Sequence, residues 1–132
     1  NGAESTAFGR SNVADGNMST AFGNLTTSTG NYSTSWGYYN ESHDYIETTF
    51  GRFATISDGS TESWIDTDVL WKVGNGASDV ARADALKMLK NGNTTVNGIW
   101  TFVSGISYTN PNLSATTVEE ALDEIVELIL GS

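Results

Sequence analysis

The sequence contains no cysteine, one proline and only six lysine and arginine residues, against sixteen aspartate and glutamate residues. Without cysteine, the chain forms no disulfide and offers no thiolate to a metal ion. A formal net charge of −10, with no basic patch, argues against binding to nucleic acid or to an anionic membrane surface. There is also no apolar run of about 18 residues, so we predict no membrane insertion of this segment.

The residue patterns of common catalytic sites are missing as well. The sequence has no Gly-x-Ser-x-Gly, no phosphate-binding P-loop and no His-Glu-x-x-His. Two carboxylates could act on a glycosidic bond, but the spacing of the acidic residues indicates neither a cleft nor a raised pKa. We therefore predict that the chain is not an enzyme and has no catalytic residue and no cofactor.

Serine, threonine, glycine and aromatic residues recur in a fixed order in the first half of the chain. Ser5-Thr6-Ala7-Phe8-Gly9 returns unchanged at 19–23, as Ser-Thr-Ser-Trp-Gly at 33–37 and as Glu-Thr-Thr-Phe-Gly at 47–51. The spacing of fourteen residues gives each copy one aromatic side chain: Phe8, Phe22, Trp36 and Phe50. Self-similarity at a fixed period indicates a fold of stacked repeats.

Each repeat also has a weaker second half, offset by seven residues. Seven residues are too few for a helical hairpin but suit a short strand and a tight turn, so we expect one coil of two strands per repeat. We expect positive φ at the glycine of the second half, a position that Asp44 and Asp58 occupy in the later repeats. At roughly 4.8 Å per coil, four coils would be about 20 Å tall.

The alternation of side chains along a strand assigns the two faces of each coil. We predict that the interior holds small residues, namely Ala7, Ala14, Ala21, Ser28, Ser35 and Ser42. The aromatic column of Phe8, Phe22, Trp36 and Phe50 then lies outside the coil. Because exposed aromatic rings favour association, we expect several chains to bury this column together around one axis.

These repeats resemble the heads of trimeric autotransporter adhesins (YadA-like heads), a repeat that also occurs in bacteriophage tail fibres. The resemblance covers about residues 1–59. It implies a left-handed parallel β-roll with three chains side by side in an intertwined homotrimer. The family usually has isoleucine or valine at the aromatic position, so the departure implies a wider or differently packed axis. Gly2 already fits the phase of Gly16, so we expect a piece of a longer fibre.

The chain after the repeats has the pattern of short strands. Residues 69–73 alternate as in a half-buried strand, and 85–89 form a second candidate. Asn91-Gly92 predicts a two-residue hairpin turn leading to a third strand. We interpret 61–105 as a small antiparallel region. The stretch 69–98 is similar to a module that often follows such repeats in phage tail-fibre proteins.

A helix is predicted near the C-terminus, after Pro111, which interrupts regular secondary structure. Thr116 or Thr117 can cap it, with a glutamate three residues later. Its apolar residues follow the spacing of a coiled-coil seam: Val118, Leu122, Ile125 and Ile129. Together with the aromatic column, this seam favours a trimeric coiled coil, and packing of the helix on its own domain is the alternative.

Two groups of residues are candidates for binding. Three copies of His43 could hold a metal only if its column faced the trimer axis, which the face assignment excludes. Asp66 and Asp68, with Asp58 and Glu62 nearby, could hold Ca²⁺, but no calcium-loop pattern is present, so we predict no metal site. A polar and aromatic surface is formed by Tyr38, Tyr39, Asn40 and Tyr45. It suits a carbohydrate or protein receptor, because stacking and hydroxyl hydrogen bonds combine there. A fibre wall that only faces solvent is the alternative.

The predicted fold is mainly β, with a β-roll head (1–59), an antiparallel β connector (60–105), a linker (106–115) and a coiled-coil helix (116–130). We expect a homotrimeric fibre or adhesin segment that attaches to a cell-surface glycan or protein receptor, or presents a binding tip. Its expected location is extracellular or on the surface of a virion or particle. A purely structural fibre spacer and a glycan-degrading fibre enzyme with a site shared between chains are the alternatives.

Overall fold

The computed structural model describes residues 1–101 and 118–131. The protein is mainly β, with a β-solenoid of about three turns of parallel strands and one C-terminal helix. The chain forms two compact units, Asn1–Gly98 and Ile99–Ser132, which are described separately below.

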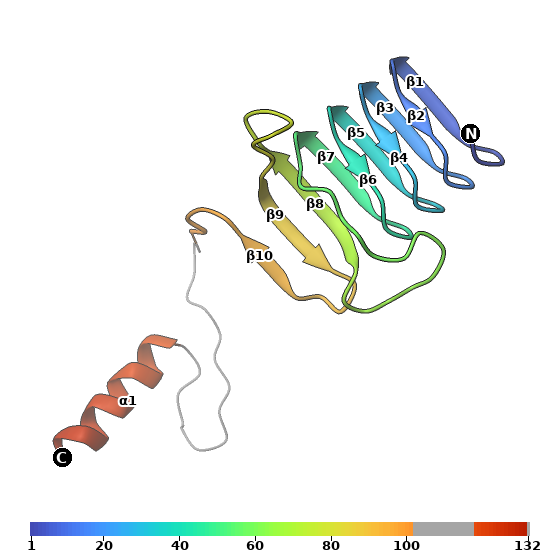
Figure 1. Ribbon diagram of the computed structural model, residues 1–132. Coiled ribbons are helices and arrows are strands. Elements are labelled where there is room, and N and C mark those ends of the chain that lie inside the picture. The colour runs from blue at the N-terminus through green and yellow to red at the C-terminus, as the bar shows by residue number, and fades with distance from the viewer. Residues whose placement is uncertain (102–117, 132) are drawn as a thin grey trace. The chain divides into compact units, whose positions relative to one another are not determined.

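The solenoid consists of two parallel sheets that face each other across a thin interior (Figure 1). One sheet contains the longer strands β1 (Thr6–Arg10), β3 (Thr20–Asn24), β5 (Thr34–Tyr38) and β7 (Thr48–Arg52). The other contains β2 (Val13–Ala14), β4 (Thr27–Ser28) and β6 (Glu41–Ser42). Thr6 pairs with Thr20, and Thr20 with Thr34, so paired residues lie fourteen positions apart. The stacked parallel strands expected from the sequence are confirmed.

The interior of the solenoid holds small side chains. Five of the six residues predicted to point inward are at most 1% exposed: Ala14, Ala21, Ser28, Ser35 and Ser42. The sixth, Ala7, is exposed because β1 is the edge strand of its sheet. Two hydroxyl groups in this interior donate to the backbone, Ser28 Oγ to the Thr20 carbonyl at 2.7 Å and Ser42 Oγ to the Thr34 carbonyl at 2.6 Å.

The corners between the sheets differ from expectation. Left-handed φ angles of 45–61° recur at every seventh residue, at Glu4, Ser11, Met18, Leu25, Tyr32, Tyr39, Ile46 and Phe53. Asp44 and Asp58 are not among them, so the prediction for the second-half glycine position is wrong. Gly16 is needed there for a different reason, since a Cβ would lie 2.1 Å from the carbonyl oxygen of Gly30.

The sheet of longer strands continues past the last coil. β8 (Val69–Asn75) pairs in parallel with β7, and β9 (Asp84–Leu89) and β10 (Thr94–Val96) follow in antiparallel order. The expected antiparallel pairing is therefore present, while the parallel pairing of β7 with β8 carries one seven-stranded sheet across the expected boundary near residue 59. The four-segment division of the chain stays a prediction.

The β9–β10 hairpin has a longer turn than predicted. The Leu89 amide donates to the Asn93 carbonyl at 2.9 Å, which leaves three residues, 90–92, in the loop. Gly92 has φ 89°, a conformation that suits a three-residue turn with a bulge. The two-residue turn at Asn91-Gly92 is thus corrected by one residue.

The C-terminal helix α1 (Val118–Leu130) has a largely exposed apolar stripe. Ala121 is buried, whereas Leu122, Ile125 and Ile129 are 58%, 42% and 77% exposed. The capping threonines at 116 and 117, the linker 106–115 and the side chain of Val118 lie outside the described residues. No helix in the described part of the chain is long and apolar enough to cross a membrane. The coiled coil stays a prediction.

Candidate functional site

The outer face of the longer-stranded sheet carries the aromatic column. Phe8, Phe22 and Trp36 are 66%, 41% and 58% exposed, and Phe50 is partly exposed. The rings of Phe8 and Phe22 stack with centroids 5.3 Å apart, and Trp36 meets Phe22 edge-on at 5.5 Å. The column is therefore a continuous apolar stripe on the solenoid surface, as the alternation of side chains predicts.

Shallow apolar recesses lie between these rings. The larger has a volume of about 510 Å³ and is lined by Trp36, Gly37, Thr48, Phe50 and Gly51. A second, of about 270 Å³, is lined by Thr20, Phe22, Thr34 and Trp36. Apolar groups line both recesses, so the face can receive apolar side chains of another chain.

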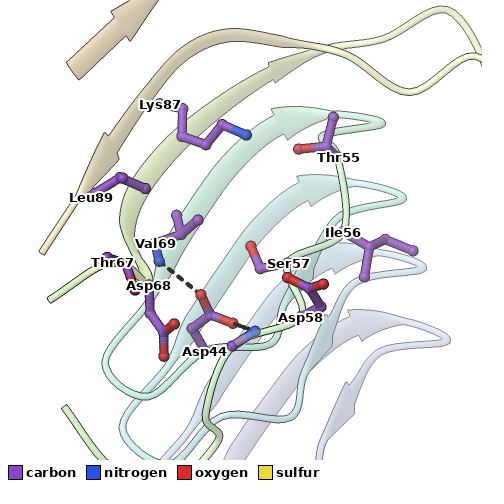
Figure 2. Close-up of a pocket in the computed structure, with 11 residues that line it drawn as sticks. Asp44, Thr55, Ile56, Ser57, Asp58, Thr67, Asp68, Val69, Lys87 and Leu89 are labelled. Carbon is purple, nitrogen blue, oxygen red and sulfur yellow. Dashed lines mark hydrogen bonds between the residues drawn. The ribbon is translucent and has the colours of Figure 1, made fainter. Parts of the chain in front are cut away.

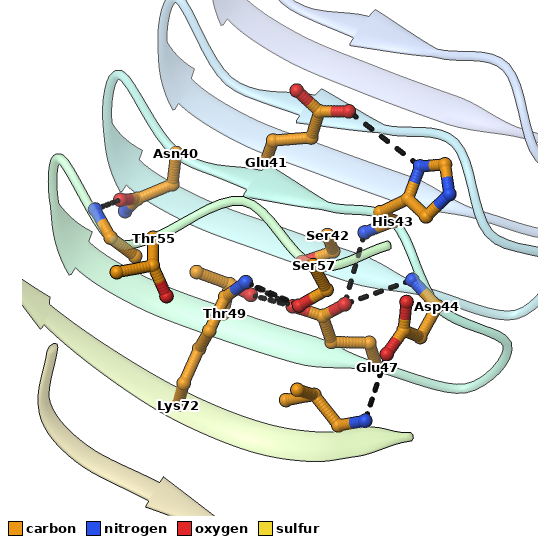
Figure 3. A network of polar contacts seen from close by, with 12 residues as sticks. Asn40, Glu41, Ser42, His43, Asp44, Glu47, Thr49, Thr55, Ser57 and Lys72 are labelled. Carbon is orange, nitrogen blue, oxygen red and sulfur yellow. Dashed lines mark hydrogen bonds and ion pairs between the residues drawn. The ribbon is translucent and has the colours of Figure 1, made fainter. Parts of the chain in front are cut away.

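The interior of the solenoid ends in a buried ion pair (Figure 3). Lys72 of β8 pairs with Thr49 across the sheet, so its side chain points into the core column. Its Nζ lies 2.7 Å from Glu47 Oε1 and 2.7 Å from Ser57 Oγ, and both charged side chains are 0% exposed. Glu47 also accepts hydrogen bonds from the amides of His43 and Asp44 and from Thr49 Oγ1. The two buried charges therefore neutralise each other, and each also has a polar partner.

Carboxylates fasten the loop 53–68 to the last coil. Asp44 is 1% exposed and accepts hydrogen bonds from the amides of Gly59 and Val69, each at 2.8 Å (Figure 2). Burial raises the pKa of Asp44, since the hydrogen bond from Val69, which lowers it, offsets this effect only in part. Asp84 binds the amide and hydroxyl of Thr55 in the same way.

Asp44 also borders a cavity of about 210 Å³, which Asp58, Asp68 and Lys87 help to line (Figure 2). The oxygens of Asp44 are committed to backbone amides, and Asp68 Oδ2 accepts from the Ser60 amide at 2.8 Å. Asp44 and Asp68 therefore hold the loop in place through hydrogen bonds to its backbone amides.

The residues considered for metal binding in the sequence make contacts of other kinds. His43 Nδ1 lies 3.2 Å from Thr29 Oγ1 and 3.8 Å from Glu41 Oε1. Asp66 Oδ1 accepts from the Trp64 indole at 3.0 Å. Among residues 1–101 and 118–131, no group of three or more potential ligands gathers around one point.

Two of the proposed receptor-binding residues lie at one corner of the solenoid, together with Phe53 and Arg82. We call this group, Tyr38, Tyr39, Phe53 and Arg82, the Arg82 corner. Its three rings contact one another at 5.2–5.8 Å, and the guanidinium lies 5.7 Å from the Tyr39 ring centre. Arg82 donates to the carbonyls of Tyr39 and Ala54 at 3.0 Å and pairs with Asp79. Arg82 thus links the backbone at Tyr39 to the backbone at Ala54.

Asn40 is 2% exposed inside the solenoid. Its amide nitrogen donates to the carbonyls of Trp36 and Gly51 at 2.8 Å, and its oxygen accepts from the Ala54 amide at 3.0 Å. Two coils earlier, Asn12 makes the same contacts: its side-chain amide donates to the carbonyls of Phe8 and Gly23. Asn40 therefore supports the stacking of coils, and its amide hydrogens are not directed to a receptor.

Tyr45, the fourth proposed residue, lies at the opposite corner. There it joins residues that the sequence patterns do not single out, and we call Tyr32, Tyr45, Trp64 and Lys90 the Lys90 corner. The Tyr32 and Tyr45 rings meet edge-on at 5.7 Å. Lys90 Nζ lies 5.7 Å from the Tyr45 ring centre and 5.4 Å from that of Trp64. The structure thus separates Tyr45 from Tyr38 and Tyr39.

No local signal identifies Lys90 or Trp64 in the sequence. Lys90 stands beside a hairpin turn, where lysine is common and exposed. The loop that carries Trp64 is brought to this corner by backbone bonds from the Tyr45 amide to the Ser60 carbonyl and from the Asn31 amide to the Thr61 carbonyl. These contacts between distant segments determine the site.

No protein-family model matches the chain, and neither does any curated protein or any solved structure. The functional argument therefore depends on the geometry described above.

Proposed function

We propose that this chain is a segment of a homotrimeric fibre or adhesin that attaches its bearer to a cell surface. In the proposed assembly three solenoids of the left-handed β-roll type lie side by side, and their aromatic columns meet at the common axis. The observation that carries the proposal is the exposure of Phe8, Phe22 and Trp36 along one face. Contiguous exposed apolar surface of this kind marks an association site.

The helix α1 supports the same assembly independently. Leu122, Ile125 and Ile129 lie on one stripe at coiled-coil spacing and are largely exposed. A second and third copy of the helix would cover this stripe. We therefore assign both the aromatic column and the helical stripe to contacts between copies of the chain, with the fibre outside the cell or on a particle surface.

Attachment by such a trimer would depend on avidity. Three identical faces engage a surface at once, and the second and third contacts form at a high effective concentration. A weak contact per chain is then sufficient for stable attachment. A fibre that only holds a binding tip elsewhere would have the same assembly but no contact of its own, which is the spacer alternative.

The solution mass tests the assembly. The chain is 14.1 kDa, and light scattering on a sizing column should give about three times that mass. Trp36→Asp, which places a charge on the aromatic column, should give monomeric or unfolded protein. Val80→Asp is the matched control, because Val80 is 97% exposed at a turn away from the column, and it should leave the mass unchanged. A monomeric wild-type chain, or a Trp36→Asp trimer of unchanged melting temperature, contradicts the assignment.

A further inference from the structure

The Lys90 corner contains a buried ammonium group without a hydrogen-bond acceptor. Lys90 is 8% exposed, and its Nζ makes no hydrogen bond within the part of the chain that the structure describes. The rings of Tyr45 and Trp64 attract the charge, but they offer no acceptor for its three N–H groups. A charge this buried is ordinarily paired as well as desolvated.

Each of the two carboxylates near this corner has one oxygen bonded to a group other than Lys90. Asp66 Oδ1 accepts from the Trp64 indole at 3.0 Å, and Asp68 Oδ2 accepts from the Ser60 amide at 2.8 Å. The backbone carbonyls of the same two residues accept from the amides of Asn91 and Lys90. These bonds fix the Trp64 ring and the Lys90 backbone while leaving the ammonium unpaired.

The aromatic rings of the corner present flat, half-exposed surfaces. Tyr32 and Trp64 are each 49% exposed. Trp64 is held by its indole bond to Asp66, and Tyr32 by its edge contact with Tyr45. Fixed rings of this kind bind the apolar face of a sugar at a small entropic cost, since little side-chain freedom remains to be lost.

We propose that the Lys90 corner binds an acidic saccharide. A sugar ring stacks on Trp64, whose ring centre lies 5.4 Å from Lys90 Nζ, and its carboxylate accepts hydrogen bonds from Lys90 Nζ after a small outward rotation of the lysine side chain. This inference rests on the proposed attachment function and names the class of receptor, a surface glycan that contains uronate or sialate.

The carboxylate distinguishes this ligand from a neutral sugar. An ionised acceptor forms shorter and stronger hydrogen bonds to ammonium than a hydroxyl does, and it also neutralises the buried charge. The protein's net charge of −10 repels anions at long range, but salt screens charges beyond about 8 Å at physiological ionic strength. The local ammonium therefore decides the preference once the sugar is stacked.

The test uses a printed array of uronate- and sialate-containing oligosaccharides beside neutral oligosaccharides of matched length. The wild-type chain should be retained on acidic spots and not on neutral ones. Lys90→Met keeps the apolar stem and removes the charge, and it should weaken retention on acidic spots about tenfold or more. Trp64→Ala should abolish it. Lys87→Met, three residues earlier on β9 with a 39% exposed side chain, is the matched control and should bind as wild type.

Melting curves and light scattering on the same samples show that each variant is folded and assembled as wild type. Equal retention on acidic and neutral spots, or acidic retention that Lys90→Met leaves unchanged, overturns the proposal. Loss in Tyr38→Ala instead of Trp64→Ala moves the receptor site to the Arg82 corner, which overturns this inference and keeps the attachment function. A trimer that no acidic spot retains overturns the inference and favours the spacer, whereas a monomeric wild-type chain overturns the proposed assembly itself.

Discussion

Lys72 in β8 and Lys90 in the turn after the adjacent strand β9 are both buried, but their ammonium groups have opposite surroundings. Lys72, at the end of the solenoid interior, contacts Glu47 and Ser57 at 2.7 Å each. Lys90, after β9, faces two aromatic rings and no acceptor. The ammonium of Lys72 finds its acceptors within the protein, whereas we propose that the ammonium of Lys90 finds its acceptor on a ligand. Burial alone therefore does not tell a structural lysine from a binding lysine, and the partners of the ammonium do.

The largest effect should come from removing the charge of Lys72. Lys72→Met leaves the Glu47 carboxylate buried without its counterion, which costs about 3–5 kcal/mol of unfolding free energy. Most of the stability of a small domain would be lost, and urea unfolding monitored by circular dichroism measures it. Glu47→Gln combined with Lys72→Met should recover much of the loss, because no unpaired charge then remains.

Lys87→Met provides the control for this substitution. Lys87 is 39% exposed and 3.8 Å from Asp84, so its loss should cost less than about 1 kcal/mol. If Lys72→Met were no more harmful than Lys87→Met, the ion pair would not hold the end of the solenoid together.

An intermediate effect is expected at Asp44, a buried charge whose partners are backbone amides. Asp44→Asn keeps one acceptor for two amides, and the orphaned N–H should cost about 1 kcal/mol at neutral pH. Because burial raises the pKa of Asp44, the native state binds its proton more tightly than the unfolded chain does. The ordinary pKa of an aspartate is 3.8, and the pKa of Asp44 in the folded protein is higher. The stability contributed by Asp44 thus falls as the pH rises from the first of these pKa values through the second.

This dependence is measured by urea unfolding of wild type and of Asp44→Asn at intervals of about one pH unit, from about pH 3 to about pH 7. The stability difference in favour of wild type should be largest at the acid end and shrink as pH rises. A difference that grows with pH would mean that the amides of Gly59 and Val69 outweigh burial and lower the pKa of Asp44.

The repeat fixes the stacked strands and most of the interior, because residues of the same type fourteen positions apart can pair only as parallel neighbours. Ala14, Ala21 and Ser28 follow from side-chain alternation alone. The corners do not follow, since left-handed φ at Leu25 or Ile46 opposes local preference and is imposed by the stacking of neighbouring coils.

The candidate site was only partly predictable for a related reason. Tyr45 was identified as part of a polar and aromatic surface. Its partner Trp64 reaches it through the path of the loop 53–68, and Lys90 through the pairing of β9 with β8, and no local pattern predicts either. The same loop places Lys72 opposite Glu47, since β8 enters the sheet parallel to β7. Contacts between segments this distant depend on the whole packed structure and not on spacing.

The smallest effect on stability should come from Lys90→Met, although the substitution is chemically the same as at Lys72. It removes attraction to two rings, worth about 0.5–2 kcal/mol, and also removes the larger cost of a buried ammonium without an acceptor. The free energy of unfolding should stay within about 1 kcal/mol of wild type or rise, as measured by urea unfolding in parallel with Lys72→Met. A loss as large as that of Lys72→Met would make Lys90 a structural residue like Lys72, since only a charge that stabilises the free protein is costly to remove. Retained stability together with lost binding to acidic saccharides would instead show that the ammonium serves a ligand.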